Sequence, residues 1–228
     1  MYHNVIRQQN LLTPAFLKVY LVCGLITAII SLTGINLVGG LTSSPEHILV
    51  LIFPRYLIFS GLMPTYLLSL LPCIQPRVQD VLLYHSRKII TLQILYRVSI
   101  STLLMAGIWS LTNITVITVN GAAYLLETIW LYLLIRAVYL WLACFLLGLI
   151  AATIVLATKS KLMAFFVSFG ICGLSFFLVI SHLPSLFFDF SARNSNPLLL
   201  AKGVIMLGLV CFMIALLTAI VNLSLIHI

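Results

Sequence analysis

The sequence predicts an all-α integral membrane protein with about six transmembrane helices. Of its 228 residues, 63% are hydrophobic and 7% are charged, and the mean hydropathy is +1.23. Soluble domains are roughly 45–50% apolar and about 25% charged, so a soluble protein is excluded. Long apolar runs alternate with short polar segments along the chain. Because one span needs about 20 mainly apolar residues, this length predicts about six spans in a single transmembrane domain.

The first two spans follow an amphipathic start. Residues 1–18 mix polar and apolar side chains, which predicts a segment along the membrane surface. Residues 19–38 are almost wholly apolar and predict span one, which we expect to be retained as an anchor. Span two is predicted at residues 48–71 and contains Pro54 and Pro64, with Pro72 directly after it. Each proline removes a backbone donor, so we expect this helix to be broken or bent.

The remaining spans are predicted at residues 98–119, 137–157, 162–183 and 203–222. The run 121–158 is too long for one span at about 1.5 Å per residue. We therefore interpret residues 122–136 as an external interfacial helix or as an extension of span four. Aromatic and polar residues mix at 184–200, which is typical of a membrane interface and predicts a segment that lies there or dips back into the bilayer. Residues 223–228 resemble translated sequencing-adapter sequence, with a natural tail as the alternative.

The distribution of lysine and arginine predicts that both termini are cytoplasmic. The outer loops receive only Arg193 and Lys202, and Arg55 and Arg136 lie near outer span ends. The other basic residues fall on the cytoplasmic side, as the positive-inside rule requires: Arg7, Lys18, Arg77, Arg87, Lys88, Arg97, Lys159 and Lys161. They form no stripe with interleaved aromatic residues, so nucleic acid is not an expected partner.

The chain lacks the motifs of membrane enzymes. It has no HExxH, no paired intramembrane aspartates and no P-loop, and its acidic residues are far apart in sequence. We therefore expect no enzymatic activity, no metal and no bound cofactor in this chain. Ser175 and His182 would lie roughly 10 Å apart along one helix, which is too far for a direct hydrogen bond. The five cysteines contain no CxxC pair, and we expect no disulfide.

Two arginines near the predicted hydrocarbon core need an explanation. An arginine at a helix centre costs at least about 2.5 kcal/mol on insertion scales. One interpretation is that Arg55 and Arg136 extend toward the outer headgroups. The other is that they line a substrate path or pair with Glu46 or Glu127 across helices. Close helix packing is predicted separately, where Gly148 and Ala152 form a small-xxx-small pair in span four.

Residues 73–97 are the most polar part of the chain. Built as a helix from Val78, this segment places apolar side chains on one face and Asp80, Tyr84 and Arg87 on another. Such a pattern predicts a helix on the inner membrane surface. A solvated loop that obeys the positive-inside rule is the alternative.

The stretch Val-Leu-Leu-Tyr-His-Ser-Arg-Lys at residues 81–88 resembles the first cytoplasmic loop of ABC-2 type permeases. The similarity is greatest to small bacterial permeases found with peptide export and bacteriocin immunity systems. The layout of a surface segment, six spans and cytoplasmic termini is similar as well. Tyr84 departs from the family pattern, which often has arginine there. So do Ile89 and Ile90, where a further basic residue is expected.

The resemblance implies a permease subunit that exports a peptide or amphipathic substrate across a bacterial cytoplasmic membrane. Its partners would be a second permease chain and a separate ABC ATPase, which would bind the ATP and magnesium. The polar segment would be a coupling helix that docks into the ATPase through Arg77, Asp80, Tyr84, His85, Ser86, Arg87 and Lys88. The alternative function is a polytopic membrane immunity or binding protein that acts without an ATPase.

Overall fold

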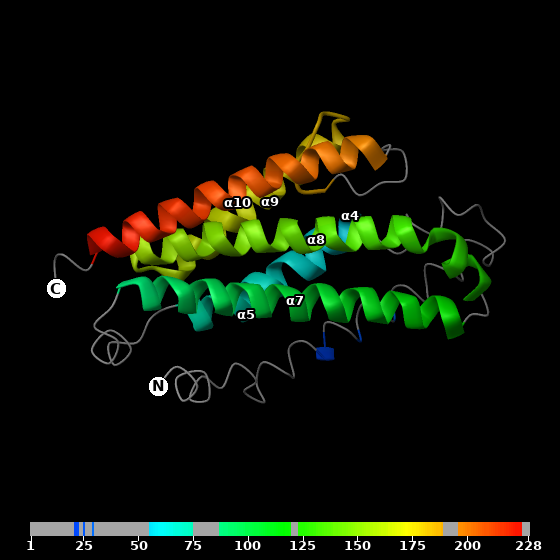
Figure 1. Ribbon diagram of the computed structural model, residues 1–228, viewed down its shortest axis with the longest axis horizontal. Coiled ribbons are helices and arrows are strands. Elements are labelled where there is room, and N and C mark those ends of the chain that lie inside the picture. Colours follow the sequence, from blue (N-terminus) through cyan, green and yellow to red (C-terminus); the bar gives the residue numbers. More distant parts are fainter. Residues whose placement is uncertain are drawn as a thin grey trace.

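The computed structural model describes residues 55–74, 87–119, 123–188 and 196–224, together with Leu21, Val22, Leu25 and Ile29. All regular structure in these ranges is helical (Figure 1). Its elements are α4 (Arg55–Leu57), the π-helix η1 (Ile58–Leu62), α5 (Met63–Ile74), α7 (Arg87–Val119), α8 (Ala123–Thr158), α9 (Lys161–Ile180) and α10 (Asn196–Ser224). Most of predicted span one and the whole of segment 1–18 lie outside the described residues.

Five helices in the described ranges are long and apolar enough to cross a membrane. Because a helix bonds its backbone groups internally, continuous apolar runs of this length can enter a bilayer without exposing unpaired amides. The predicted all-α class with membrane-spanning helices is thereby confirmed for the described part. The five segments are Arg55–Ile74, Lys88–Val119, Ile129–Thr158, Lys161–Ile180 and Pro197–Leu223.

Three helices have different limits from the predicted spans. Helix α7 begins at Arg87 rather than at residue 98, and α10 begins at Asn196 rather than at residue 203. Helix α8 runs without interruption, so residues 123–136 extend span four and form no separate external helix. At about 1.5 Å per residue, α7 and α8 are roughly 50 Å long, well beyond a hydrocarbon core of about 30 Å. The helix limits differ from the predicted spans because polar residues were assigned to connecting segments. They belong to these helices, which continue beyond their apolar parts.

The interruption predicted for span two takes the form of the π-helix η1. The N–H of Met63 donates to the carbonyl of Ile58, a π-type bond one residue longer than an α-helical bond. The next residue, Pro64, has no N–H and cannot bond the carbonyl of Ser60 in the α-helical pattern. The π-turn thus precedes the residue at which the α-helical ladder is broken, whereas Pro72 lies inside α5.

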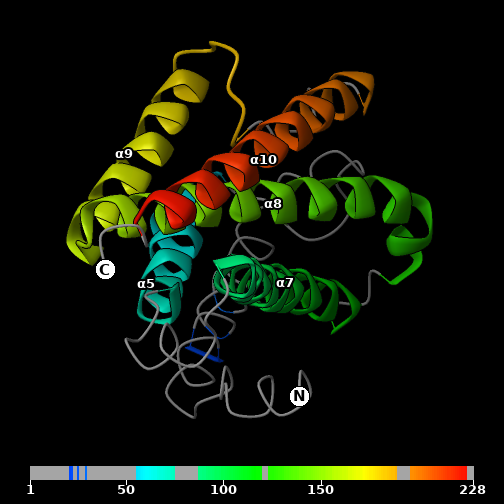
Figure 2. The same cartoon turned by 60° about the vertical axis from the view of Figure 1, so that its left-hand side comes forward.

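Helix α8 is the centre of the bundle. It packs against α5, α7, α9 and α10 (Figure 2). Of an 18-residue apolar stretch within α8, 72% is buried inside the protein, compared with 22% of such a stretch in α10. The outer faces of α9 and α10 instead expose large apolar side chains that suit contact with lipid. They include Leu162, Phe166, Leu174, Phe177, Val204, Ile205 and Phe212.

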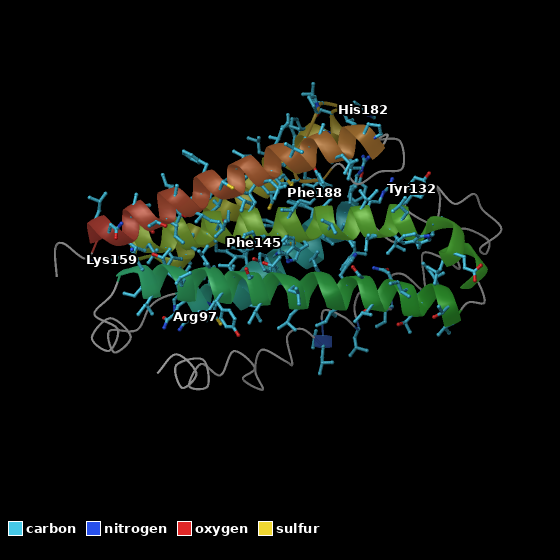
Figure 3. All side chains as sticks on the ribbon, in the orientation of Figure 1. Arg97, Tyr132, Phe145, Lys159, His182 and Phe188 are labelled. Carbon is cyan, nitrogen blue, oxygen red and sulfur yellow. The ribbon has the colours of Figure 1, made fainter. Side chains whose placement is uncertain are left out.

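Successive long helices run in opposite directions and divide the bundle into two ends. Figure 3 places Arg97 and Lys159 toward one end, with Tyr132 and His182 toward the other. We name the first the basic end, defined by Arg87, Lys88, Arg97, Lys159 and Lys161, and the second the distal end. Within the described residues the sole acidic side chain, Glu127, is in the first turns of α8 at the distal end. Which of the two ends faces the cytoplasm stays a prediction.

The end of α9 is a Schellman motif with histidine at the left-handed position. The Leu183 N–H donates to the Leu178 carbonyl at 2.8 Å, and the His182 N–H donates to the Val179 carbonyl at 3.2 Å. His182 has a φ of 58°, a conformation that glycine adopts without steric penalty. His182 is therefore part of the structure that ends α9. Ser175, the residue with which it was paired in the sequence analysis, is buried within α9.

This backbone conformation predicts that His182→Gly stabilises the protein. The expected gain in the free energy of unfolding is roughly 0.5–1 kcal/mol, because glycine relieves the left-handed penalty. Thermal unfolding in detergent, followed by circular dichroism, measures it. His182→Val is the opposing control, since a β-branched residue should lower the melting temperature; a rise with valine would contradict the left-handed assignment.

Candidate functional site

The predicted coupling segment is described only at its end. Arg77, Asp80, Tyr84, His85 and Ser86 lie outside the described residues. Arg87 and Lys88 form the first turn of α7, and the Lys88 side chain is exposed. Residues 87–89 are continuous with α7, a helix long and apolar enough to cross a membrane, and the predicted surface helix at residues 78–86 stays a prediction.

At the basic end, an arginine of α7 forms a hydrogen bond with the last turn of α5. The Arg97 Nη1 atom donates to the Cys73 carbonyl at 2.6 Å. Cys73 belongs to the last turn of α5, where carbonyls lack helical N–H partners. A guanidinium there also interacts favourably with the negative end of the helix dipole. The two helices that flank residues 75–86 are thus joined directly to each other.

Arg136 lies inside the bundle. Its side chain is 2% exposed, and its Nη1 atom donates to the Tyr132 carbonyl at 3.3 Å. The charge of Arg136 is therefore held within the protein, and its depth relative to the outer headgroups stays a prediction. Arg55, at the start of α4, is partly exposed. A role for either residue in a substrate path stays a prediction.

Helix α8 approaches α5 and α7 closely at Gly148. A Cβ atom added there would lie 2.7 Å from Val98 Cγ1 and closer still to Tyr66 Oη. The Tyr66 hydroxyl shares a 2.8 Å hydrogen bond with Thr102 Oγ1, which donates to the Val98 carbonyl. Helices α5, α7 and α8 therefore meet where α8 lacks a side chain. The small-xxx-small pair had predicted close packing at Gly148. No pattern in the sequence indicated that Tyr66 would take part in this contact.

An aromatic cluster joins the span-two helix to α9. We define it as Tyr56, Phe59, Phe169, Phe176 and Phe188. The ring of Phe59 stacks on Phe169 with centroids 5.2 Å apart and on Phe176 with centroids 4.5 Å apart. Phe188 meets Phe59 and Phe176 edge-on at 6.0 and 5.8 Å, and Tyr56 meets Phe176 at 5.3 Å. This cluster was not predicted from the sequence; the spacing of Phe169 and Phe176 by seven residues was its one available signal.

Residues 183–188 lie against the distal part of the bundle. The Tyr139 hydroxyl donates to the Leu186 carbonyl, and Phe187 and Phe188 are buried (Figure 3). We name residues 183–188 the distal segment. Ser185, Phe187 and Phe188 are buried against protein, whereas Leu183 is exposed, and the dip into the bilayer predicted for residues 184–200 stays a prediction. Residues 196–200 are the first turns of α10, and residues 189–195 lie outside the described part.

The described residues bring no metal-binding group together. No three of their His, Cys, Asp and Glu side chains gather as metal ligands, and Cys73, Cys144, Cys172 and Cys211 are free thiols. No family model, curated protein or solved structure matches the chain. The arrangement thus offers a packed helical core, a basic end and an aromatic contact between helices.

Proposed function

We propose that this chain is the membrane-spanning permease subunit of an ABC transporter, exporting a peptide or amphipathic substrate with ATP hydrolysed by a separate subunit. The chain would work with a second permease chain in a bacterial cytoplasmic membrane, with both termini inside. What supports the proposal in the sequence is the resemblance of residues 81–88 to a permease coupling loop. The absence of any P-loop motif from the sequence agrees with ATP binding by a partner.

The observation that carries the proposal is the position of Arg87 and Lys88. Both residues begin α7 at the basic end, directly after residues 75–86. Since α7 is about 50 Å long, its first turns extend beyond a hydrocarbon core of about 30 Å and reach a partner outside the bilayer. The Arg97 bond to Cys73 ties α7 to α5 beside this connection.

A displacement at this connection would act on two central helices together. Helix α5 and helix α7 both pack on α8, so a docked ATPase that moves residues 75–86 would move them relative to the bundle centre. ATP-driven closure of two ATPase subunits would then bias the bundle between inward-open and outward-open states. The coupling residues act mechanically in this scheme and perform no chemistry.

Co-purification from the native host tests the proposal. The tagged chain is isolated in mild detergent, and its stoichiometric partners are identified by mass spectrometry. We expect a P-loop ATPase whose hydrolysis is stimulated by the chain. An Asp80, Arg87 and Lys88 triple alanine variant should return hydrolysis to the rate of the ATPase alone, because the docking contacts are removed.

The matched control is the Lys159→Ala, Lys161→Ala double variant. It removes two charges from the same end of the bundle but from the turn between α8 and α9, so stimulation should persist. If the triple variant still stimulates the ATPase, the coupling role is overturned. If the chain is recovered without an ATPase, the alternative of an immunity or binding protein stands instead.

A further inference from the structure

The helix that crosses the membrane over Arg55–Ile74 is held unequally along its length. No residue of α4 is buried. In α5, by contrast, Tyr66, Leu67 and Leu70 are each 0% exposed, and the Tyr66 hydroxyl is bonded to Thr102. The basic-end part of this helix is therefore fixed in the core, while the distal part has a smaller share of buried contacts.

The π-helix η1 lies at the boundary between these two parts. A π-turn contains one residue more than an α-turn and is frequently found at functional sites in helices. Here it is followed by Pro64, which cannot supply the bond that would restore the α-helical ladder at Ser60. The α-helical bonding pattern is therefore interrupted close to the point where the share of buried residues rises, and π-turns and prolines are sites at which helices bend.

Phe59, a residue of η1, makes the ring contacts that hold the distal part against α9. Its ring lies between Phe169 and Phe176 at interplanar angles of 9° and 6°. Gly173, between those two positions on α9, lies beside the ring, and a Cβ there would be 3.9 Å from it, an ordinary van der Waals distance. Stacked rings of this kind attract each other beyond the apolar area that they bury.

The same ring is connected to the distal segment. Phe188 is fully buried and contacts both Phe59 and Phe176 edge-on. Two residues earlier, the Leu186 carbonyl accepts the bond from Tyr139 of α8. Separation of Phe59 from α9 would therefore remove part of the support of the distal segment.

From these observations we propose that η1 is a hinge and Phe59 its latch, so that the distal part of Arg55–Ile74 swings away from α9 while α5 stays packed. The closed position is the one in which Phe59 stacks between Phe169 and Phe176. The opening releases Phe188 and thereby loosens the distal segment. This device belongs to the chain itself and does not depend on an ATPase partner.

Hydrogen exchange of the purified protein in lipid nanodiscs tests the latch. Phe59→Ala should accelerate amide exchange about tenfold at residues 58–64 and at the distal segment, because three ring contacts are lost. Exchange at residues 66–74 should stay unchanged. Phe165→Ala is the matched control, since Phe165 stacks on Phe169 but is not among the rings that contact Phe59.

Two further variants keep the test decisive. Phe59→Leu retains an apolar side chain if the alanine variant folds poorly, and it should still accelerate exchange at residues 58–64. Deletion of Ser60 removes the extra residue of the π-turn and should slow exchange there below the unmodified level. Equal acceleration at residues 66–74, or identical profiles for the Phe59 and Phe165 variants, would overturn the hinge and leave Phe59 as an ordinary packing residue.

Discussion

Gly148→Leu is expected to lower the melting temperature of the detergent-solubilised protein sharply. A side chain there enters space already occupied by Val98, Leu70 and Tyr66, and the first added atom alone would be 3.1 Å or less from each of them. Overpacking of a well-packed core typically costs 1–3 kcal/mol and occasionally more, so we expect a loss of about 3 kcal/mol. Thermal unfolding monitored by tryptophan fluorescence measures it.

Glycines in open space supply the control for this prediction. At Gly208 of α10, no atom lies within 4 Å of the position that a Cβ would take. Gly208→Ala should be neutral or stabilising by up to about 1 kcal/mol, because alanine favours the helix. Gly148→Ala should destabilise. Equal effects of the two alanine variants would contradict a close approach at Gly148.

A double variant identifies the atom responsible. Tyr66 Oη is the nearest neighbour of the added atom, and the same hydroxyl is bonded to Thr102. Tyr66→Phe alone should cost about 1 kcal/mol through the lost hydrogen bond. Combined with Gly148→Ala it should be less harmful than the two single losses added together, since removal of the hydroxyl relieves the overlap.

The sequence predicted features that depend on local composition. Uninterrupted apolar runs were sufficient to predict membrane-crossing helices, because a segment that enters lipid has no other way to pair its backbone. Pro64 predicted an interruption of the second span, and the structure has η1 directly before it. Gly148 predicted close packing for the same kind of reason, since a missing side chain is visible in the sequence itself.

Features that depend on which way a side chain faces were not predictable. Arg136 was interpreted as reaching the headgroups because a hydropathy pattern does not distinguish a residue facing lipid from one facing the bundle. The polar residues near Arg97 suggested a segment separate from the helix of span three. They are instead the first turns of α7, where Arg97 bonds the last turn of α5. The stacking of Phe59 on α9 joins segments far apart in sequence and required the tertiary structure.

Arg136→Ala is the second substitution for which we expect a large effect. Arg136 is among the largest fully buried side chains of the described residues and belongs to α8, the most buried helix. Truncation of a large core side chain to alanine typically costs 2–5 kcal/mol, because it leaves a cavity. A loss of about 3 kcal/mol, measured by thermal unfolding in detergent, is the expected result.

Two further variants, Arg136→Met and Arg55→Ala, show how much of the lost stability comes from packing and how much from the hydrogen bond. Methionine retains an unbranched apolar stem but cannot donate to the Tyr132 carbonyl, so its loss should be smaller, about 1–2 kcal/mol. Arg55 is partly exposed in a helix with no buried residue, and Arg55→Ala should change stability by less than about 0.5 kcal/mol. Similar losses at both arginines would contradict the buried position of Arg136.

The methionine variant also separates a structural role from one in transport. If the chain is the proposed permease and Arg136 serves packing and helix bonding, export in cells should fall only as far as the amount of folded protein falls. If its charge lines a substrate path, Arg136→Met should abolish export while folded protein remains abundant in the membrane. The structure favours the first result, because a side chain that is 2% exposed offers a substrate little surface unless the bundle opens.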